Sequence, residues 1–359
     1  MTNDGSDSDR NEAVGPTERP MVTGELAKVG GRIKVEPEDF EVREIPAYEP
    51  SGEGPHYYLR VEKRDVDGRS MVDAIADRYG VDKADIGTAG IKDRRAVTRQ
   101  WVSIPAHSVD EPRPEFIDEQ IEVLRVSRHR NKLGTGHLNG NRFSVWIRDT
   151  ERSGPELREA VEAVRDRIDD IGLPNYYGLQ RFGNNNSTLR AGLKWLVKGE
   201  KPRTHFLRKM AASAVQSEVF NRVLKYRLEA DSWKTVVDGD IFEKTDTGGR
   251  FWIDESEREE TQRRLEQREI VVTGPMPGSK RGLADGRAGE IEREHMAQLG
   301  IGEEDVHAFG RRGRGTRRPM TIYIDELGVE VDGRDVRLDF ELPAGSYATV
   351  LMREFMGDG

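Results

Sequence analysis

The sequence predicts an α+β protein in which a sheet domain is interrupted by an insertion. Segments with the alternating pattern of β-strands lie near both ends of the 359-residue chain, and the middle is rich in helical patterns. Separate runs of strands and helices, rather than a regular alternation of the two, are typical of α+β folds. Periodicity alone does not prove that the two sets of strands share one sheet.

The first strands are expected between residues 34 and 63. The stretch "RIKVEPEDFEVREI" contains runs of alternation, "HYYLRVEKR" alternates more clearly, and the Gly- and Pro-containing loop "AYEPSGEGPH" separates them. A helix follows in "SMVDAIADRYG", where Ser70 and Asp73 have the spacing of a capping box and Gly80 supplies a stop. Further along, "QWVSI" predicts another strand.

The middle of the chain begins with a strand and then becomes helical. "NRFSVWIRD" is predicted as a strand, and "GPELREAVEAVRDRIDDIG" as an amphipathic helix with Pro155 in its first turn and Gly172 after its end. A long helix is expected over residues 205–230, with shorter ones over 255–268 and 289–299. The chain closes with the predicted strands "TIYIDEL" and "VRLDFELP" and the helix "SYATVLMREFM".

Composition limits the class of protein. Hydrophobic residues make up 35% and charged residues 34% of the chain, which is polar but compatible with a folded protein. No apolar run is long enough to span a membrane, and the polar start lacks the apolar core of a signal peptide. We therefore expect a cytoplasmic protein with a disordered tail over residues 1–20. The absence of cysteine and the lack of paired histidines at ligand spacing argue against disulfides and a metal site.

The net charge of −9 argues at first against a nucleic-acid partner, because phosphate binding depends on Lys and Arg. Only 14 of the 57 basic residues are Lys, and an acidic, Arg-rich chain resembles proteins from salt-loving archaea. An acidic surface would then serve solubility. Local basic clusters can still form a binding groove.

Asp93 is the main candidate for chemistry. In "AGIKDRRAVTRQW" it lies among basic residues on a loop between a predicted helix and a predicted strand, a common place for catalytic groups. Three other stretches stand out: "KVEPEDFEV" with Lys34 and Phe40, "HRNKLGTGHLNGNRF" with Asn141 and Phe143, and the aromatic-rich "NYYGLQRFG". Each is weak alone, because a Lys at a strand start is commonly a solvated edge residue and Phe143 fits a core position.

Together these stretches resemble the TruD family of pseudouridine synthases. "GIKDRRAVTRQ", "NYYGLQRFG", "PEDFEV" with "GEGPHYYLRVEKR", "GNRF", "TGPMPG" and "ELPAGSYATVLMRE" occur in the order and spacing of that family, from about Lys34 to Glu354. The resemblance implies a catalytic domain with a mixed or antiparallel sheet, over residues 21–171 and 317–359. An inserted α-rich TRUD domain would occupy residues 172–316. The implied activity is the isomerisation of uridine to pseudouridine in tRNA, typically at position 13.

The resemblance also implies the site residues. It makes Asp93 the catalytic carboxylate and Lys34 its basic partner, and it places Phe143, Asn141 and Phe40 at the target base, with the ring of Phe143 stacked on it. Tyr177 stands where many relatives have Phe, which is a conservative difference. The candidate RNA contacts are basic or amide side chains: Arg128, Arg130, Lys132, Asn175, Gln180 and Arg181, together with the cluster Arg311, Arg312, Arg314, Arg317 and Arg318.

The implied reaction explains why no cofactor signal is needed. It breaks a C–N glycosidic bond, turns the bound uracil and rejoins it through carbon, so we expect neither a nucleotide cofactor nor a metal. An ionised carboxylate must act at the ribose, either as a nucleophile or as a base for the 2′ proton, and the sequence does not choose between these. One unit charge at ~4 Å is worth roughly 4 kcal/mol at an effective dielectric constant near 20, so Lys34 is expected to keep Asp93 charged in a closed pocket.

Two other classes of protein would use the same residues differently. A non-catalytic RNA-binding protein would use the basic and aromatic stretches for shape recognition, and Asp93 would then be dispensable. An RNA hydrolase would usually hold a divalent metal with clustered carboxylates, and the sequence shows no such cluster near Asp93. We expect tRNA as the partner, no membrane partner, and a monomer.

Overall fold

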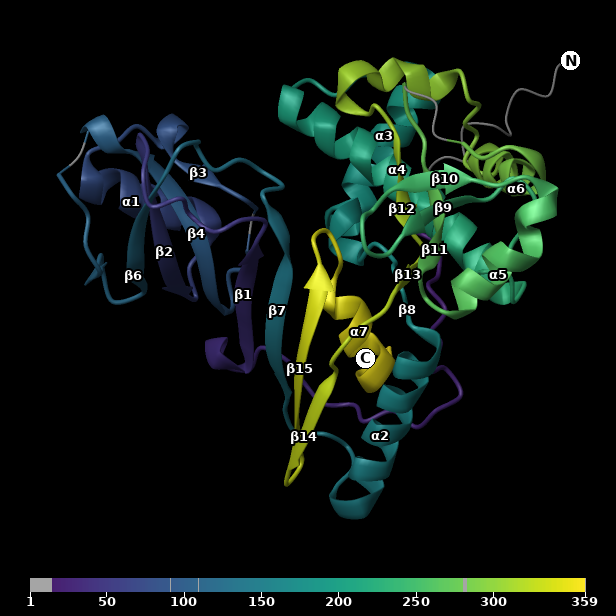
Figure 1. The fold of residues 1–359 in the computed structure, drawn as a ribbon, viewed down its shortest axis with the longest axis horizontal. Coiled ribbons are helices and arrows are strands. Elements are labelled where there is room, and N and C mark those ends of the chain that lie inside the picture. The colour runs from purple at the N-terminus through teal and green to yellow at the C-terminus, as the bar shows by residue number, and fades with distance from the viewer. Residues whose placement is uncertain (1–14, 91, 109, 280–282, 359) are drawn as a thin grey trace, which may run out of the picture. The chain divides into compact units, whose positions relative to one another are not determined.

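The computed structural model describes residues 15–90, 92–108, 110–279 and 283–358, and the chain divides into two compact units (Figure 1). Unit 1 consists of Met1–Val22 and Leu173–Ile322, and unit 2 of Thr23–Gly172 and Tyr323–Gly359. These bounds lie close to the predicted ones. Residues 317–322, however, belong to unit 1, because they pair with strands of that unit rather than with the predicted sheet domain.

The predicted disordered tail falls largely on residues 1–14, which lie outside the described residues. Its described end contacts helix α4 (His205–Glu229): the backbone N–H of Thr17 donates to the carboxylate of Glu218 at 3.0 and 3.2 Å, and Glu18 pairs with Lys225 at 3.2 Å. In the part that the structure describes, this segment is therefore held against unit 1.

A mixed sheet forms the centre of unit 2, in the order β14-β15-β7-β1-β4-β2-β6-β5, with β3 paired to β4. Neighbouring strands are antiparallel except β1 and β4, which are parallel. Its strands are β1 (Phe40–Pro46), β2 (His56–Arg64), β3 (Gly87–Thr88), β4 (Val97–Pro105), β5 (Glu115–Phe116), β6 (Ile121–His129), β7 (Leu138–Ile147), β14 (Gly328–Asp332) and β15 (Asp335–Pro343). The strands predicted near the start of the chain thus share one sheet with the predicted strand "VRLDFELP", whereas "TIYIDEL" does not join it, and the α+β class is confirmed.

Helices cover the two halves of this sheet separately. Met71 and Ile75 of α1 (Gly68–Tyr79) are buried in a core with apolar residues of β2, β4 and β6. At the other end, α2 (Gly154–Ile171) and α7 (Ala348–Met356) pack on each other, and α2 contacts β14 (Figure 1). Short 3-10 helices occur in the connections: η1 (Pro37–Asp39), η2 (Lys83–Asp85) and η3 (Ala106–Ser108).

The predicted start of α1 is wrong. The helix begins one turn earlier, because the carboxylate of Asp67 accepts hydrogen bonds from the backbone N–H groups of Arg69 and Ser70 at 2.9 and 3.0 Å. An acidic side chain at this position satisfies N–H groups that have no partner within the helix. The predicted stop is confirmed, since Gly80 adopts a left-handed conformation with φ 63°.

Unit 1 contains more strand than predicted. Two small sheets, β10-β9-β11-β12 and β13-β8, accompany the helices of the described residues. The helices are α3 (Ser187–Lys198), α4, α5 (Arg258–Glu266), α6 (Gly286–Ala297), η4 (Leu179–Phe182), η5 (Asn184–Asn186), η6 (Glu255–Glu257) and η7 (Asp305–Arg312). The strands are β8 (Leu173–Pro174), β9 (Ile241–Lys244), β10 (Arg250–Trp252), β11 (Ile270–Met276), β12 (Thr316–Pro319) and β13 (Thr321–Ile322). Of the predicted strand "TIYIDEL", only Thr321–Ile322 is extended in a ladder.

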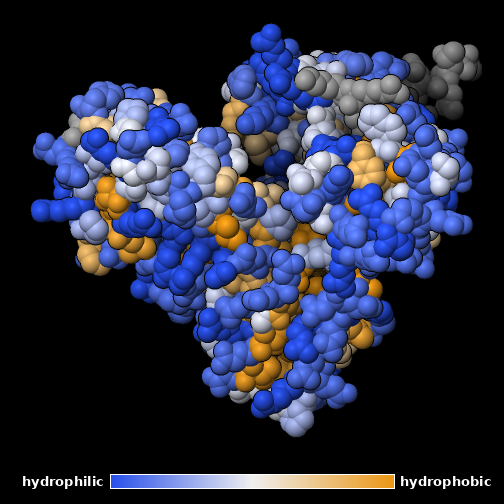
Figure 2. Space-filling model, viewed as in Figure 1, coloured by the Kyte–Doolittle hydropathy of each residue, from blue (hydrophilic) through white to orange (hydrophobic). Residues whose placement is uncertain are grey.

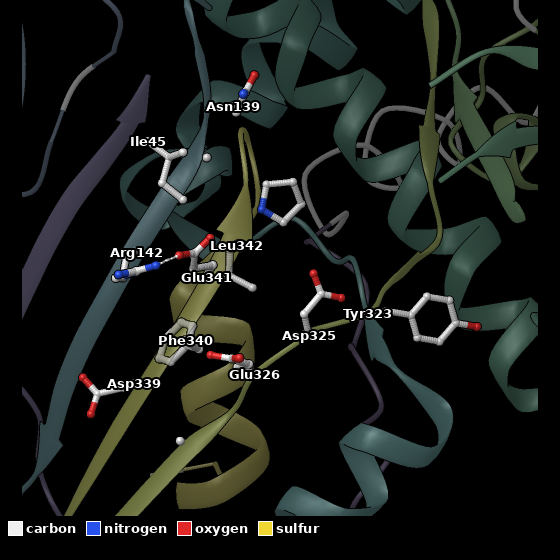
Figure 3. Close-up of a pocket in the computed structure, with 13 residues that line it drawn as sticks. Ile45, Asn139, Arg142, Tyr323, Asp325, Glu326, Asp339, Phe340, Glu341 and Leu342 are labelled. Carbon is white, nitrogen blue, oxygen red and sulfur yellow. Dashed lines mark hydrogen bonds and ion pairs between the residues drawn. The ribbon is translucent and has the colours of Figure 1, made fainter. Parts of the chain in front are cut away.

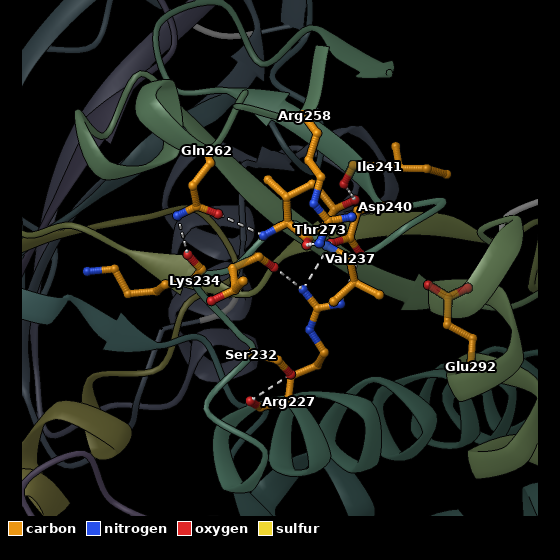
Figure 4. Close-up of polar contacts among 12 residues, drawn as sticks. Arg227, Ser232, Lys234, Val237, Asp240, Ile241, Arg258, Gln262, Thr273 and Glu292 are labelled. Atoms are coloured by element: carbon orange, nitrogen blue, oxygen red, sulfur yellow. Dashed lines mark hydrogen bonds and ion pairs between the residues drawn. The ribbon is translucent and has the colours of Figure 1, made fainter. Parts of the chain in front are cut away.

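Charged groups are buried in the interior of unit 1 (Figure 4). Arg227 is 1% exposed, and its guanidinium donates to both carboxylate oxygens of Asp240, at 3.0 and 2.9 Å, and to the carbonyl of Thr235 at 3.0 Å. Asp240 also accepts from the backbone N–H of Val237 at 2.8 Å. This pair links the end of α4 to the strand β9.

The face of the molecule that Figure 2 shows is mainly polar. Figure 2 shows hydrophilic residues over most of the visible face and hydrophobic residues in smaller areas. Within the described residues, no helix is both long and apolar enough to cross a membrane.

We predict that Asp240→Ala destabilises unit 1 strongly. It leaves a buried guanidinium without its counter-charge, which costs about 3 to 5 kcal/mol. Urea unfolding followed by tryptophan fluorescence measures the change. Glu260→Ala, which removes the partner of the exposed Arg263, is the matched control and should unfold like the wild type. Equal midpoints for all three proteins would contradict the structural role of the buried pair.

Candidate active site

An ion pair joins Lys34 and Asp93 in unit 2. The Nζ atom of Lys34 lies 2.6 Å from Oδ2 of Asp93. Lys34 precedes η1 in a left-handed backbone conformation with φ 58°, which is uncommon for a residue with a β-carbon. The side chain of Asp93 is 42% exposed, so the closed pocket expected from the sequence is not present around this carboxylate.

Aromatic rings continue from this ion pair. The Nζ atom of Lys34 lies 4.1 Å from the ring centroid of Phe40, whose centroid is 6.0 Å from that of Phe143 in an edge-to-face arrangement. Phe143 in turn stacks on Phe340, with centroids 5.2 Å apart and an interplanar angle of 16°. The structure thus brings four predicted site residues together in one row, and sequence reasoning missed Phe340.

Phe143 itself is largely covered. Its residue exposure is 8%, and one face of the ring lies against Phe340. Little of the ring is therefore accessible to a base in this structure. The structure thus places Phe143 in the core, as the alternating pattern of its strand suggested.

A second set of polar contacts orients Asn141. The Nζ atom of the buried Lys92 donates to Oδ1 of Asn141 at 2.9 Å and lies 3.2 Å from the buried carboxylate of Glu44. Glu44 also accepts from the backbone N–H of Trp101 at 3.3 Å. Lys92 precedes Asp93 in the chain, so these contacts fix one end of the Asp93 loop. The sequence could have indicated that Glu44 is buried, because Glu44 continues the alternation of the apolar residues Phe40 and Val42.

Lys63 holds the other side of the loop and was missed by the sequence analysis. It is fully buried on β2, and its Nζ donates to the backbone carbonyls of Asp93 and Val66 at 2.6 and 2.7 Å. Burial lowers the pKa of Lys63 to about 8, against the opposing effect of the Asp93 charge. A neutral amine still has two N–H donors for these two carbonyls. The sequence could have indicated this burial, because Lys63 continues the alternation of the apolar residues Tyr57, Leu59 and Val61.

The remaining basic residues near Asp93 in the sequence mostly have structural partners. Arg99 forms ion pairs with Glu41 at 2.9 Å and Glu62 at 2.6 Å, and Arg95 donates to the carbonyl of Val35 at 2.9 Å. Arg95 and Arg64 line a pocket of about 460 Å³. The cationic sequence around Asp93 is therefore used largely to build the site.

A larger pocket of about 740 Å³ lies along β15 (Figure 3). Its lining includes the acidic residues Asp325, Glu326 and Asp339, and Arg142 is paired there with Glu341 at 2.7 Å. Such a lining disfavours phosphate. Asp93 does not line this pocket. Within the described ranges, no group of three or more His, Asp or Glu could hold a metal ion.

The RNA-contact candidates of unit 2 lie at the end of β6 and in the loop after it. Arg128 is exposed but lies over the ring of Tyr57 at 4.8 Å and donates to its hydroxyl at 2.9 Å. Arg130 pairs with Glu53, and Lys132 donates to the carbonyl of Ala84 at 2.6 Å. All three are exposed, so their charges can still reach a phosphate.

The candidates of unit 1 divide into buried and accessible groups. Asn175 is 5% exposed and bonds with the carbonyl of Pro319 at 2.9 Å and with Arg318, whose guanidinium lies 4.1 Å from the ring centroid of Tyr177. Arg181 is half-buried against serines of α4, and Gln180 is exposed. For Asn175 and Arg318, which bind parts of unit 1, a contact with RNA has no support from the structure.

The predicted arginine cluster divides in the same way. Arg317 is 6% exposed and pairs with the buried Glu292 at 2.7 Å, which makes it a structural residue. Arg311 and Arg314 are exposed and Arg312 is half-buried. The expectation of five phosphate contacts is therefore wrong for Arg317 and Arg318, because residues of unit 1 already neutralise or cover them.

The sequence matches a class of RNA-modifying isomerases. The family model described as tRNA pseudouridine synthase D (TruD) matches residues 18–204 and 202–355. The chain therefore belongs to the TruD family of tRNA pseudouridine synthases.

Relatives in sequence and structure agree with this assignment. A tRNA pseudouridine synthase D of Thermus thermophilus is 40% identical over 341 residues, which cover 95% of this chain and 93% of the relative. That of an Anaeromyxobacter species is 41% identical, with 96% and 97% covered. A Methanosarcina mazei crystal structure described as TruD shares the fold, with a TM-score of 0.72, 23% identity and 98% of each chain covered. Both sequence relatives are bacterial, so they do not support the expected archaeal, salt-loving origin.

We predict that the contribution of Lys63 to stability rises with pH. The pKa of Lys63 is about 8 in the folded chain and 10.5 is its ordinary value, so the unfolded chain binds more protons between these pH values. The free energy of unfolding of the wild type, minus that of Lys63→Met, should therefore increase by up to about 3 kcal/mol across this window. Urea unfolding of both proteins at a series of pH values measures the difference. A difference that falls with pH would mean that the folded state favours the ammonium form.

Proposed function

We propose that this chain isomerises uridine to pseudouridine in tRNA, at position 13, with Asp93 as the catalytic carboxylate. The observation that carries the proposal is the Asp93 carboxylate, accessible and paired with Lys34 at 2.6 Å beside a row of aromatic rings, in a chain of the TruD family. The tRNA substrate follows from the names of the family and its relatives. A cytoplasmic location and a monomeric state stay predictions.

The proposed reaction conserves all atoms of uridine. The bond between C1′ of the ribose and N1 of uracil breaks, a bond between C1′ and C5 forms, and the proton on C5 is lost while N1 gains one. Asp93 acts at the ribose, as a nucleophile on carbon or as a base for the 2′ proton. Lys34, at 2.6 Å from Asp93, supplies the counter-charge beside this carboxylate.

The aromatic row supports binding of an extruded base. Turning a uridine out of folded RNA costs a few kcal/mol, and stacking on a ring returns about 1 to 3 kcal/mol. We propose that the base meets Phe143 beside Phe40, and that Asn141, oriented by Lys92, faces its polar edge. The exposed Arg128, Arg130, Lys132, Gln180 and Arg181 are proposed as further RNA contacts.

Incubation of the purified protein with an unmodified tRNA transcript, without ATP or added metal and in parallel with and without a chelator, tests the proposed function. Pseudouridine mapping should show conversion at position 13. Binding without conversion at any uridine would favour a non-catalytic RNA-binding protein, and cleavage that the chelator stops would favour a hydrolase. Parallel reactions in molar KCl test the salt-loving origin, which rests on composition.

We predict that Phe143→Leu lowers kcat/KM for the transcript by about 5- to 100-fold, because loss of the aromatic contact with the extruded base costs about 1 to 3 kcal/mol. Leucine keeps an apolar side chain in the core, so the free energy of unfolding should fall by less than about 1.5 kcal/mol. Steady-state kinetics and urea unfolding measure the two effects. A folded variant with wild-type kinetics would show that Phe143 serves only the core.

A further inference from the structure

The turn between α3 and α4 carries an unusual concentration of positive charge for this chain. Residues 190–209, here called the hairpin tip, contain seven Arg and Lys and a single acidic residue, Glu200, in a protein of net charge −9. Four of the 14 lysines of the chain lie within this segment. We infer that the hairpin tip is an RNA-docking surface that binds the phosphate backbone and an unpaired base of the substrate RNA.

The charges of the hairpin tip are available to a ligand. Elsewhere in unit 1 many basic side chains have acidic partners, such as Arg222 with Glu218 and Arg250 with Glu243. Among the residues that the structure describes, none of the following forms an ion pair: Arg190, Lys194, Lys198, Lys201, Arg203 and Lys209. Since no described carboxylate pairs with these six cations, their charges remain available to attract a polyanion such as RNA.

Exposed apolar side chains accompany these charges. Phe206 is 67% exposed, Leu207 49% and Val197 43%, although all three lie in helices with buried faces available. A face that is merely solvated has no need of an outward phenylalanine. A ring among unpaired lysines and arginines is the combination with which proteins bind single-stranded nucleic acid, through stacking and phosphate contacts.

The hairpin tip is held in a defined conformation. Gly192 lies so close to α4 that an added β-carbon would approach the side chain of Val215 to 2.5 Å. Thr204 caps α4 through the N–H of Leu207 at 3.1 Å, and Arg208 donates to the carbonyls of Pro202 and Arg203 at 2.6 and 2.9 Å. One basic residue thus fixes the turn, and the others project from it without a large ordering cost on binding.

RNA is the occupant that the chemistry favours. The proposed function supplies a polyanion with unpaired bases as substrate, and the inference rests on that function. The exposed apolar area is broken up by charges, which fits stacking of a base better than a continuous hydrophobic interface.

Neutralisation of three exposed lysines tests the inference in the full chain. The variant Lys198→Gln/Lys201→Gln/Lys209→Gln is compared with Lys83→Gln/Lys244→Gln/Arg263→Gln, which removes the same charge from exposed sites elsewhere. We expect the tip variant to bind an unmodified tRNA transcript at least about tenfold more weakly, with the slope of log K against log [KCl] reduced by about two. The control and the kcat of both variants at saturating RNA should stay close to wild type.

The outcomes separate this inference from the proposed function. If the wild type isomerises uridine but both triple variants bind alike, the docking surface is wrong and the activity stands. If binding depends on the hairpin tip but no uridine is converted, the activity is wrong and the docking surface stands. If only the oligomeric state of the tip variant changes, the surface binds a second copy of the chain, and RNA docking is wrong.

A second pair of variants tests the aromatic contact without a risk to folding. Phe206→Ala should weaken binding of the transcript by about 5- to 100-fold, because stacking is worth 1 to 3 kcal/mol per base. Trp252→Ala on β10, where the residue is 77% exposed, is the matched control and should bind as the wild type does. Equal loss in both variants, or in neither, would overturn the assignment of a base to Phe206.

Discussion

The candidate active site depends on two lysines that hold the Asp93 loop from different sides. Lys34 binds the carboxylate, and the buried Lys63 binds the backbone carbonyl of the same residue. The first contact gives the carboxylate an adjacent counter-charge, whereas the second ties the backbone of the loop to the buried side chain of Lys63 on β2. Lys34 reaches Asp93 from a left-handed backbone position, and such strained positions are common at functional sites.

Most of the other charges around this loop build the site rather than bind a ligand. Lys92 joins Glu44 and Asn141, and Arg99 joins two glutamates across neighbouring strands. Cations that are neutralised in this way add little attraction for phosphate. The attraction must then come from charges without partners, and the hairpin tip of unit 1 has them. An acidic protein can thus bind RNA by leaving a few basic groups unpaired, whatever its net charge.

The sequence predicted long periodic elements better than short strands and single buried site residues. Long periodic elements such as α2 and α4 were predicted close to their observed bounds. Most strands of unit 1 were not, because in the described residues five of them have only two to four residues and give no period to detect, and the seven-residue β11 is buried throughout and does not alternate. At the site, Lys34 and Asp93 were found through family motifs. Lys63 was not, because a lysine in a strand is usually solvated and only the fold shows that β2 is buried there.

The single-turnover rate of Asp93→Asn is the most direct test of the proposal that Asp93 is the catalytic carboxylate. Enzyme in excess over a tRNA transcript separates chemistry from product release, and the amide keeps the size of the side chain while removing its charge. We predict that the rate of uridine conversion falls at least about a thousandfold, because loss of the reacting group removes several kcal/mol of transition-state stabilisation. The Kd for RNA should stay within about threefold of wild type. A rate within tenfold of wild type, with RNA bound normally, would contradict the role of Asp93 as the catalytic carboxylate.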